Sequence, residues 1–118
     1  MDRLKPLLPT LKEKKRYLAF EIISKSKIRD FSEVSKAMWA SALSYVGTKG
    51  VSQMGLWVLA EKYNASAQKG LIKVSHRSLD CMRASLALIK QIGDQPVIVR
   101  SLGASGVLAK AEKKYTGG

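Results

Sequence analysis

The stretch RYLAFEIISK, at residues 16–25, decides the fold that we predict for this chain of 118 residues. It is dense in aromatic and β-branched side chains, and Leu18, Phe20 and Ile22 fall on one face of an extended chain. Because successive side chains of a strand point to opposite faces, this spacing is typical of a strand that buries one side. We therefore expect a buried strand here.

A helix is predicted directly after this strand. Asp30, followed three residues later by Glu33, is a capping-box pattern, in which both side chains bond free backbone amides of the first turn. Apolar side chains then recur every three or four residues, as on the buried face of a helix: Phe31, Val34, Met38, Ala42, Tyr45 and Val46. We expect this helix to end at Gly47 and Gly50.

Two further strands and a second helix follow. Residues 56–63 (LWVLAEKY) and 71–75 (LIKVS) are joined by a polar turn, so we expect them to form a hairpin. Ser78 is the expected cap of a helix that ends at Gly93. The buried stripe of that helix is Leu79, Met82, Leu86 and Ile89.

A last strand at residues 95–102 (QPVIVRSL) leads through glycines into a short basic helix that ends near Tyr115. The order strand, helix, strand, strand, helix, strand is that of the split βαβ or ferredoxin-like fold. We therefore predict an α+β domain over residues 16–118, with an antiparallel sheet, helices on one face and an added C-terminal helix. Residues 1–15 are Lys-rich and broken by Pro6 and Pro9, so we expect an extended basic arm there.

Charge is the most informative property of the composition. The chain has 21 Lys and Arg against 9 Asp and Glu, which gives a net charge of +12 at neutral pH. Such an excess attracts polyanions, most commonly nucleic acid; acidic membrane surfaces, acidic proteins and a merely well-solvated surface are the alternatives. Because 46% of the residues are apolar, the chain can build a core and we do not expect disorder.

Side chains that carry out catalysis are scarce. His76 is the one histidine and Cys81 the one cysteine, and a catalytic pair of the two is disfavoured because Cys81 falls on the predicted helix. The carboxylates show no metal-ligand spacing. Glu21 and Glu61 fall in predicted strands, where salt bridges to Lys or Arg are favoured over a nuclease site. We predict no catalytic residue, no metal site and no bound cofactor in the protein itself.

The chain is also expected to work inside the cell, without a membrane anchor. Its first residues lack the apolar core of a signal peptide, and no stretch reaches the length that spans a bilayer. A single cysteine allows no intrachain disulfide and suits a reducing compartment.

The element order invites comparison with RNA-recognition motifs, whose third strand presents aromatic side chains to stacked bases. The corresponding residues 69–76 (KGLIKVSH) begin with the Lys-Gly of that motif but lack its aromatic residues. We therefore favour contacts of Lys and Arg with the backbone of a folded RNA. Trp39 and Trp57 are each compatible with core packing or with an interface, and Trp39 is our predicted anchor for a protein partner.

Several short blocks, taken in order, carry a resemblance that covers residues 14–115. They are KKRYL at 14–18, ALSYVG at 42–47, CMRASLALI at 81–89 and, most specifically, VRSLGASG at 99–106, followed by Leu108 and Lys110. In these blocks and in the hairpin the chain resembles the ribonuclease P protein component 2 family of archaea and eukaryotes. One position departs from the pattern, because Val107 stands where a threonine is expected.

The resemblance implies a noncatalytic subunit that binds the catalytic domain of ribonuclease P RNA, while the RNA holds Mg²⁺ and removes the leaders of transfer RNA precursors. It also implies pairing with a larger TIM-barrel-like protein subunit, and a homodimer that bridges two copies of that subunit. Such a protein is cytoplasmic in an archaeon and nuclear in a eukaryote. A ribosome-associated or other RNA-binding protein and a ferredoxin-like regulatory domain are the competing functions, and the high charge disfavours the second of these.

The predicted RNA-binding set combines basic residues with the closing turn. At the start of the last helix a phosphate would meet unpaired backbone amides, with Gly103 and Gly106 allowing its approach and Ser105 bonding it; alternatively, these residues only form the turn and the cap. Arg100 would grip a phosphate through paired donors. The full set is Lys14, Lys15, Arg16, Arg77, Arg83, Lys90, Arg100, Gly103, Ser105, Gly106, Lys110, Lys113 and Lys114.

Overall fold

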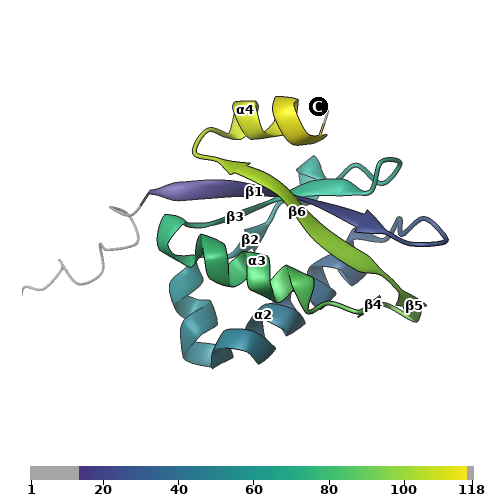
Figure 1. Cartoon of the computed structure of the whole chain (residues 1–118), viewed down its shortest axis with the longest axis horizontal. Helices are drawn as coiled ribbons and strands as arrows, with labels where there is room; N and C mark the ends of the chain where they lie inside the picture. The colour runs from purple at the N-terminus through teal and green to yellow at the C-terminus, as the bar shows by residue number, and fades with distance from the viewer. Residues whose placement is uncertain (1–13, 117–118) are drawn as a thin grey trace, which may run out of the picture.

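The computed structural model describes residues 14–116, so most of the predicted basic arm lies outside the described residues (Figure 1). The helices are α2 (Phe31–Met54), α3 (Leu79–Ala87) and α4 (Leu108–Ala111), with shorter helical turns η2 (Ala60–Lys62), η3 (His76–Ser78) and η4 (Glu112–Thr116). The strands are β1 (Lys15–Ile23), β2 (Trp57–Val58), β3 (Lys69–Ser75), β4 (Gln91–Ile92), β5 (Gln95–Pro96) and β6 (Ile98–Ser105).

The main sheet has the strand order β2-β3-β1-β6, and every neighbouring pair in it is antiparallel. The strand that comes first in the sequence therefore lies inside the sheet, between two strands that come much later. This arrangement follows from two βαβ units that are interleaved, and it confirms the ferredoxin-like prediction. A small separate hairpin of β4 and β5 lies just before β6.

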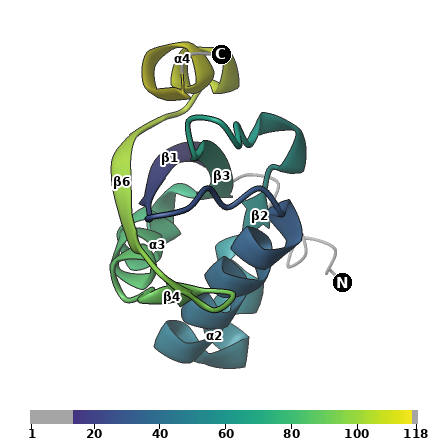
Figure 2. The ribbon, with the colours of Figure 1, turned by 90° about the vertical axis from the view of Figure 1, so that its right-hand side faces the viewer.

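The two faces of the sheet are covered differently. On one face Leu18, Phe20 and Ile22 pack with Met38 of α2 and Met82 of α3 in the main core, so the predicted buried face of β1 is confirmed. On the opposite face a smaller cluster joins Ala19, Leu59 and Leu71 to Ala111 of α4, with Tyr115 packed against them. Figures 1 and 2 show α2 and α3 on one side of the sheet and α4 on the other. We refer to the α4 side as the upper face.

The helix α2 is longer than the prediction, which placed its end at Gly47 and Gly50. Its start is as predicted, because the Asp30 carboxylate accepts a bond of 3.0 Å from the Ser32 backbone amide. Gly47 has φ 79° and ψ 172° and kinks the helix, which then continues until Gly55, at φ 62°, ends it. The helix resumes after the kink because Met54 is buried in the core.

The second helix differs from the prediction at both ends. Ser78 makes no capping bond; its hydroxyl accepts a bond of 3.2 Å from the Ser75 hydroxyl, and the turn η3 leads directly into α3. At the other end α3 stops at Ala87, and Gly93 does not end it. Gly93 has φ 64° and lies in the tight turn between β4 and β5, a conformation that glycine adopts at little cost.

The predicted strand at residues 56–63 is mostly wrong. Trp57 and Val58 pair with β3, and the Leu59 amide still donates to the Leu71 carbonyl at 3.1 Å. The Lys62 amide then donates to the Leu59 carbonyl, which coils the chain into η2. The hairpin itself is confirmed, because β2 and β3 are antiparallel neighbours.

Candidate RNA interface

Basic residues from two segments meet at one end of the sheet. The His76 amide donates to the Lys14 carbonyl at 2.9 Å, which places the start of β1 beside η3 and its exposed Arg77. We call Lys14, Lys15, Arg16, His76 and Arg77 the basic end. It gathers four residues of the predicted RNA-binding set on two segments that are far apart in the sequence.

The turn after β6 borders this basic end. Ser105 is the cross-strand partner of Tyr17, and a Cβ on Gly106 would lie 3.2 Å from a terminal nitrogen of Arg16. The Ser105 hydroxyl accepts a bond of 3.1 Å from the Val107 amide, so it satisfies a backbone donor at the start of α4. The turn therefore lies beside the basic end, but Ser105 does not cap α4, because the N-cap is Val107 and no side chain makes a capping bond there.

Gly103 serves a different purpose from the predicted one. A Cβ at this position would lie 2.5 Å from the ring of Tyr115, closer than side-chain atoms come to one another. The space beside Gly103 is thus filled by the aromatic ring and is not open to a phosphate. The role of Gly103 in this structure is to let Tyr115 pack against the sheet.

The other predicted residues lie away from the basic end. Arg83 is on α3, with its guanidinium 3.7 Å from Asp80, and Lys90 follows that helix. On β6, Arg100 is the cross-strand partner of Glu21, which lies four positions along β1 from Tyr17, the partner of Ser105. The Nε of Arg100 donates to Glu21 at 2.9 Å. This ion pair confirms the salt-bridge interpretation of Glu21, and it engages one of the five N–H donors of Arg100.

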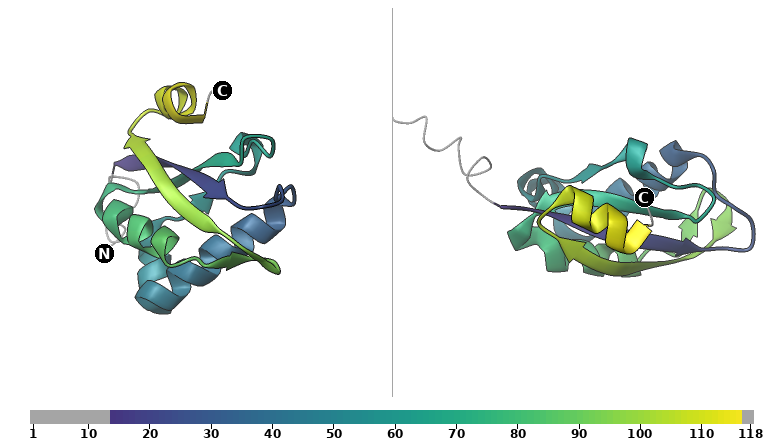
Figure 3. Two further views of the ribbon diagram at one scale, coloured as in Figure 1. Left: turned by 45° about the vertical axis from the view of Figure 1, so that its right-hand side comes forward. Right: turned by 90° about the horizontal axis from the view of Figure 1, so that it is seen from above.

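The lysines of the C-terminal segment lie on α4 and η4, across the upper face of the sheet (Figure 3). Lys110, Lys113 and Lys114 are all exposed. The ammonium of Lys114 lies 5.4 Å from the centre of the Tyr115 ring, within the range of a cation–π contact. These lysines give the upper face a positive border.

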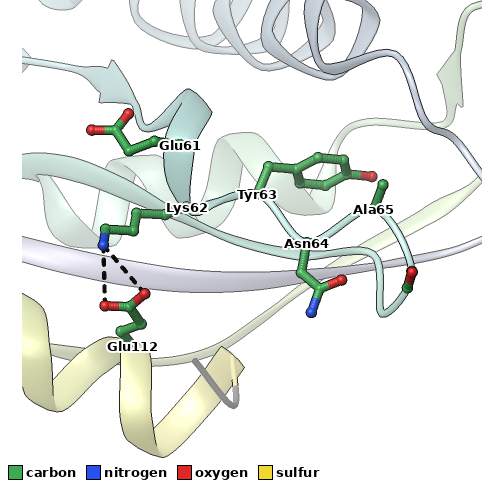
Figure 4. Close-up of a pocket in the computed structure, with 7 residues that line it drawn as sticks. Glu61, Lys62, Tyr63, Asn64, Ala65 and Glu112 are labelled. Atoms are coloured by element: carbon green, nitrogen blue, oxygen red, sulfur yellow. Dashed lines mark hydrogen bonds and ion pairs between the residues drawn. The ribbon is translucent and has the colours of Figure 1, made fainter.

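A shallow pocket separates η4 from the segment at residues 61–66 (Figure 4). Lys62 donates to both carboxylate oxygens of Glu112 at 3.2 Å, and Glu61 also lines the pocket. Two carboxylates therefore outnumber the single lysine among its lining residues, which disfavours a phosphate there. The ion pair instead ties the C-terminal segment to the segment between β2 and β3.

The candidate catalytic residues do not form a site. His76 is exposed in η3, whereas Cys81 is half-buried and packs against the main core. Glu61 lies in η2, away from any strand, and Glu21 is paired with Arg100. Within residues 14–116 no three His, Cys, Asp or Glu side chains are grouped as metal ligands, and no helix there is long and apolar enough to cross a bilayer.

Both tryptophans are exposed, so the core-packing interpretation is wrong for each of them. Trp39 is 38% exposed and lines an apolar groove beside the kink of α2, together with Leu43, Thr48, Val51, Ser52, Gly55 and Leu56. Trp57 is 61% exposed on the short edge strand β2. The exposure of Trp57 was not evident from the sequence, because β2 is too short to show an alternating pattern.

The sequence of the chain matches a known protein family. A family model described as the Rpp14/Pop5 family matches residues 16–116, which is nearly the whole described chain. The chain belongs to the Rpp14/Pop5 family. This membership confirms the resemblance that the short sequence blocks indicate.

Curated relatives of this Rpp14/Pop5 protein carry the name ribonuclease P protein component 2. The one from Thermococcus gammatolerans is 32% identical over 114 residues, 97% of this chain and 92% of the relative. The one from Methanocaldococcus jannaschii is 33% identical over 117 residues, 99% of this chain and 84% of the relative. The one from Methanococcus vannielii is 36% identical over 112 residues, 95% of this chain and 82% of the relative.

A solved structure has the same fold as this member of the Rpp14/Pop5 family. It is one chain of the cryo-EM structure of yeast ribonuclease MRP. That chain is 13% identical in sequence and superposes on this one with a TM-score of 0.60. The match covers 89% of this chain and 87% of that chain. This likeness also supports the ferredoxin-like fold of the chain.

Proposed function

We propose that this Rpp14/Pop5 protein is a protein subunit of ribonuclease P and that it binds the RNA of that particle through its basic end. The observation that carries the proposal is the meeting of Lys14, Lys15, Arg16 and Arg77 beside the turn at Ser105. Cations held on two neighbouring segments neutralise adjacent phosphates and release the counterions condensed there. The names of the curated relatives support the identity of the particle.

In this proposal the chain does not perform the hydrolysis. Removal of the leader from a transfer RNA precursor needs an activated water, and the RNA would supply the Mg²⁺ ions that activate it. The protein contributes positive charge, which lowers the concentration of Mg²⁺ that the RNA needs in order to fold and bind its substrate. The particle would work in the cytoplasm of an archaeon.

The groove at Trp39 is the surface that we assign to the larger protein subunit. None of its lining residues is charged, and two of them, Trp39 and Leu43, are large apolar side chains that remain exposed in the isolated chain. Exposed aromatic anchors beside an apolar groove are typical of protein interfaces. Homodimer formation, which would bridge two copies of that subunit, is part of the same proposal.

The test is reconstitution of precursor cleavage at limiting Mg²⁺ from the RNA and the other protein subunits, with and without this chain. The chain should raise the cleavage rate, and a K14A/K15A/R16A variant should raise it less. A K25A/K36A/K49A variant removes the same charge from exposed sites elsewhere and should behave as the wild type. Equal losses of cleavage rate in both variants would show that the basic end acts only through the net charge of the protein. Cleavage by the isolated protein would overturn the noncatalytic role.

A ribosome-associated role is the competing function that the charge alone permits. Affinity purification from cells separates the two. Precursor cleavage activity that copurifies with the chain supports the proposal, whereas cofractionation with ribosomes without such activity contradicts it.

A further inference from the structure

Trp57 occupies an unusual place on the sheet. It pairs with Lys73, and its neighbour Val58 is buried in the main core, so the side chain of Trp57 lies on the upper face. Its exposed fraction of 61% leaves much of the indole open to solvent. The open face of the indole is available for contact with a ligand.

Lysines flank this tryptophan on the same face. Lys73 is its direct cross-strand partner, and side chains in that relation lie roughly 5 Å apart at their Cβ atoms. The Nζ atom of Lys15 lies 3.4 Å from the position that a Cβ on Gly55 would occupy, two residues before Trp57. Lys15 itself belongs to the basic end, so Trp57 lies at the margin of the surface assigned to RNA.

The middle of the upper face is closed. Tyr17, on the far side of Lys73, packs against the cluster that α4 covers, and Tyr115 fills the space above Gly103. Among the described residues of this part of the upper face, the aromatic ring left open is that of Trp57 at the β2 edge, with Lys73 beside it. A surface of this kind can bind one planar ring on the indole of Trp57 and an adjacent anionic group on the ammonium of Lys73.

The two exposed tryptophans differ in their surroundings. The groove of Trp39 has no charged lining residue, which suits an apolar protein surface. Trp57 instead has a lysine, Lys73, as its cross-strand partner, and an aromatic ring beside a cation is the combination that binds unpaired nucleotides, with the base stacked on the ring and a phosphate on the lysine.

We propose that Trp57 is a stacking platform for one unpaired base of the bound RNA, whose flanking phosphates are neutralised by Lys73 and Lys15. This inference rests on the proposed RNA-binding function and adds a single-stranded element to it. It differs from the arrangement of RNA-recognition motifs, because the aromatic ring comes from the edge strand β2 and not from β3. The lack of aromatic residues in β3 therefore does not exclude base stacking on this sheet.

The fluorescence of the two tryptophans provides the first test with the full-length chain. In a W39F variant Trp57 is the sole tryptophan, and in a W57F variant Trp39 is. Short single-stranded oligoadenylate should quench the W39F protein strongly and the W57F protein little. A duplex of the same length should bind through charge without quenching Trp57, since its bases are already stacked.

Affinity for the same oligoadenylate provides the second test. Trp57→Ala should weaken binding roughly 5- to 150-fold, the loss that corresponds to one base–aromatic stack. Trp57→Phe should retain most of the affinity. Ile98→Ala is the matched control, because it removes another exposed apolar side chain from a strand of the same sheet, and it should change nothing.

The outcomes separate this inference from the function on which it rests. If the wild type binds RNA and Trp57 is neither quenched nor needed for affinity, the stacking site is wrong and the RNA-binding function stands. The stacking site is also wrong if Trp57 responds to the partner protein and not to RNA. If neither oligoadenylate nor ribonuclease P RNA binds at low salt, the proposed function itself fails.

Discussion

Gln68 is a residue on which the local structure depends although it has no catalytic chemistry. It is 5% exposed and has φ 54°, a left-handed conformation that is uncommon for residues other than glycine. Its side-chain amide donates to the Ile22 carbonyl at 2.9 Å and accepts from the Ile28 amide at 2.5 Å. Gln68 thereby fastens the end of β1 and the start of the following loop to the segment before β3.

Gln68→Ala should lower the free energy of unfolding by roughly 1–3 kcal/mol, because it leaves a buried amide and a buried carbonyl without partners. Urea denaturation followed by circular dichroism measures this loss. Gln53→Ala, at an exposed position near the end of α2, is the control and should be close to neutral. Similar losses in both variants would contradict the role assigned to Gln68.

Tyr63 gives the stability of the protein a pH dependence. Its hydroxyl donates to the Ile28 carbonyl at 2.8 Å, and its ring centre lies 6.3 Å from that of Phe20. Burial raises the pKa of Tyr63 above the ordinary value of 10.0, because the charged phenolate is poorly solvated there. In strongly alkaline solution the unfolded chain therefore loses this proton before the folded chain does.

The contribution of Tyr63 is thus fully present below pH 10.0 and is lost as the pH rises further. Tyr63→Phe should lower the free energy of unfolding at neutral pH by about 1 kcal/mol and should flatten its decline above that pH. Denaturation curves across the alkaline range measure both effects. Tyr45→Phe, at an exposed tyrosine, should leave the alkaline decline unchanged, and a decline of equal steepness in the Tyr63 variant would refute the assignment.

At the scale of the element, the C-terminal segment is held on the sheet by apolar packing around the buried Ala111 and by an ion pair. The ring of Tyr115 packs on Gly103, and Glu112 forms its ion pair with Lys62. The ion pair is partly exposed and contributes little by itself, so the apolar contacts of Ala111 and Tyr115 carry most of the attachment.

Gly103→Ala should displace Tyr115 and loosen α4 and η4, because the added methyl group overlaps the ring. Hydrogen exchange at the Ala111 amide, which donates to the Val107 carbonyl at 3.0 Å, should become faster. The double variant with Tyr115→Ala provides the control: once the ring is gone, the alanine at 103 should add almost no further change. Additive effects in the double variant would show that the two residues act independently.

Elements with strong local signals were predictable, and those set by tertiary contacts were not. The alternation of Leu18, Phe20 and Ile22 predicts β1, and Asp30 predicts the start of α2. Gly47 looks like a helix end because glycine favours that position, but burial of Met54 reverses the local preference. Residues 59–63 have strand propensity, yet a backbone bond to Leu59 coils them into η2.

The candidate RNA interface was likewise predictable where it depends on neighbouring residues and not where it depends on tertiary contacts. Lys14, Lys15 and Arg16 are adjacent in the sequence, so their grouping was predictable, but their approach to Arg77 depends on the pairing of β1 with β3. Lys73 and Trp57 were missed as a pair, because the register of β2 against β3 decides which side chains share a face. Gly103 was assigned to a phosphate because the ring that faces it is twelve residues away.

At the scale of the whole molecule, the basic end predicts a steep dependence of RNA binding on salt. Each phosphate contact contributes about 0.7–0.9 to the slope of log K against log salt concentration. The K14A/K15A/R16A variant should therefore flatten the slope by roughly 2–3, with its melting temperature little changed. Filter binding over a salt series measures the slope, and the K25A/K36A/K49A variant should keep it near the wild-type value; if both variants have the same slope, the RNA does not prefer the basic end.

The strand order β2-β3-β1-β6 also determines when each strand can pair while the chain is being synthesised. β1 leaves the ribosome before its two neighbours β3 and β6, and β6 is the last strand of the main sheet to be made. One edge of β1 therefore stays unpaired until β6 has been made, and an unpaired edge is a template for wrong strands. A nascent chain of this topology depends on rapid release, or on cellular factors that cover the edge, to reach its native sheet without aggregating.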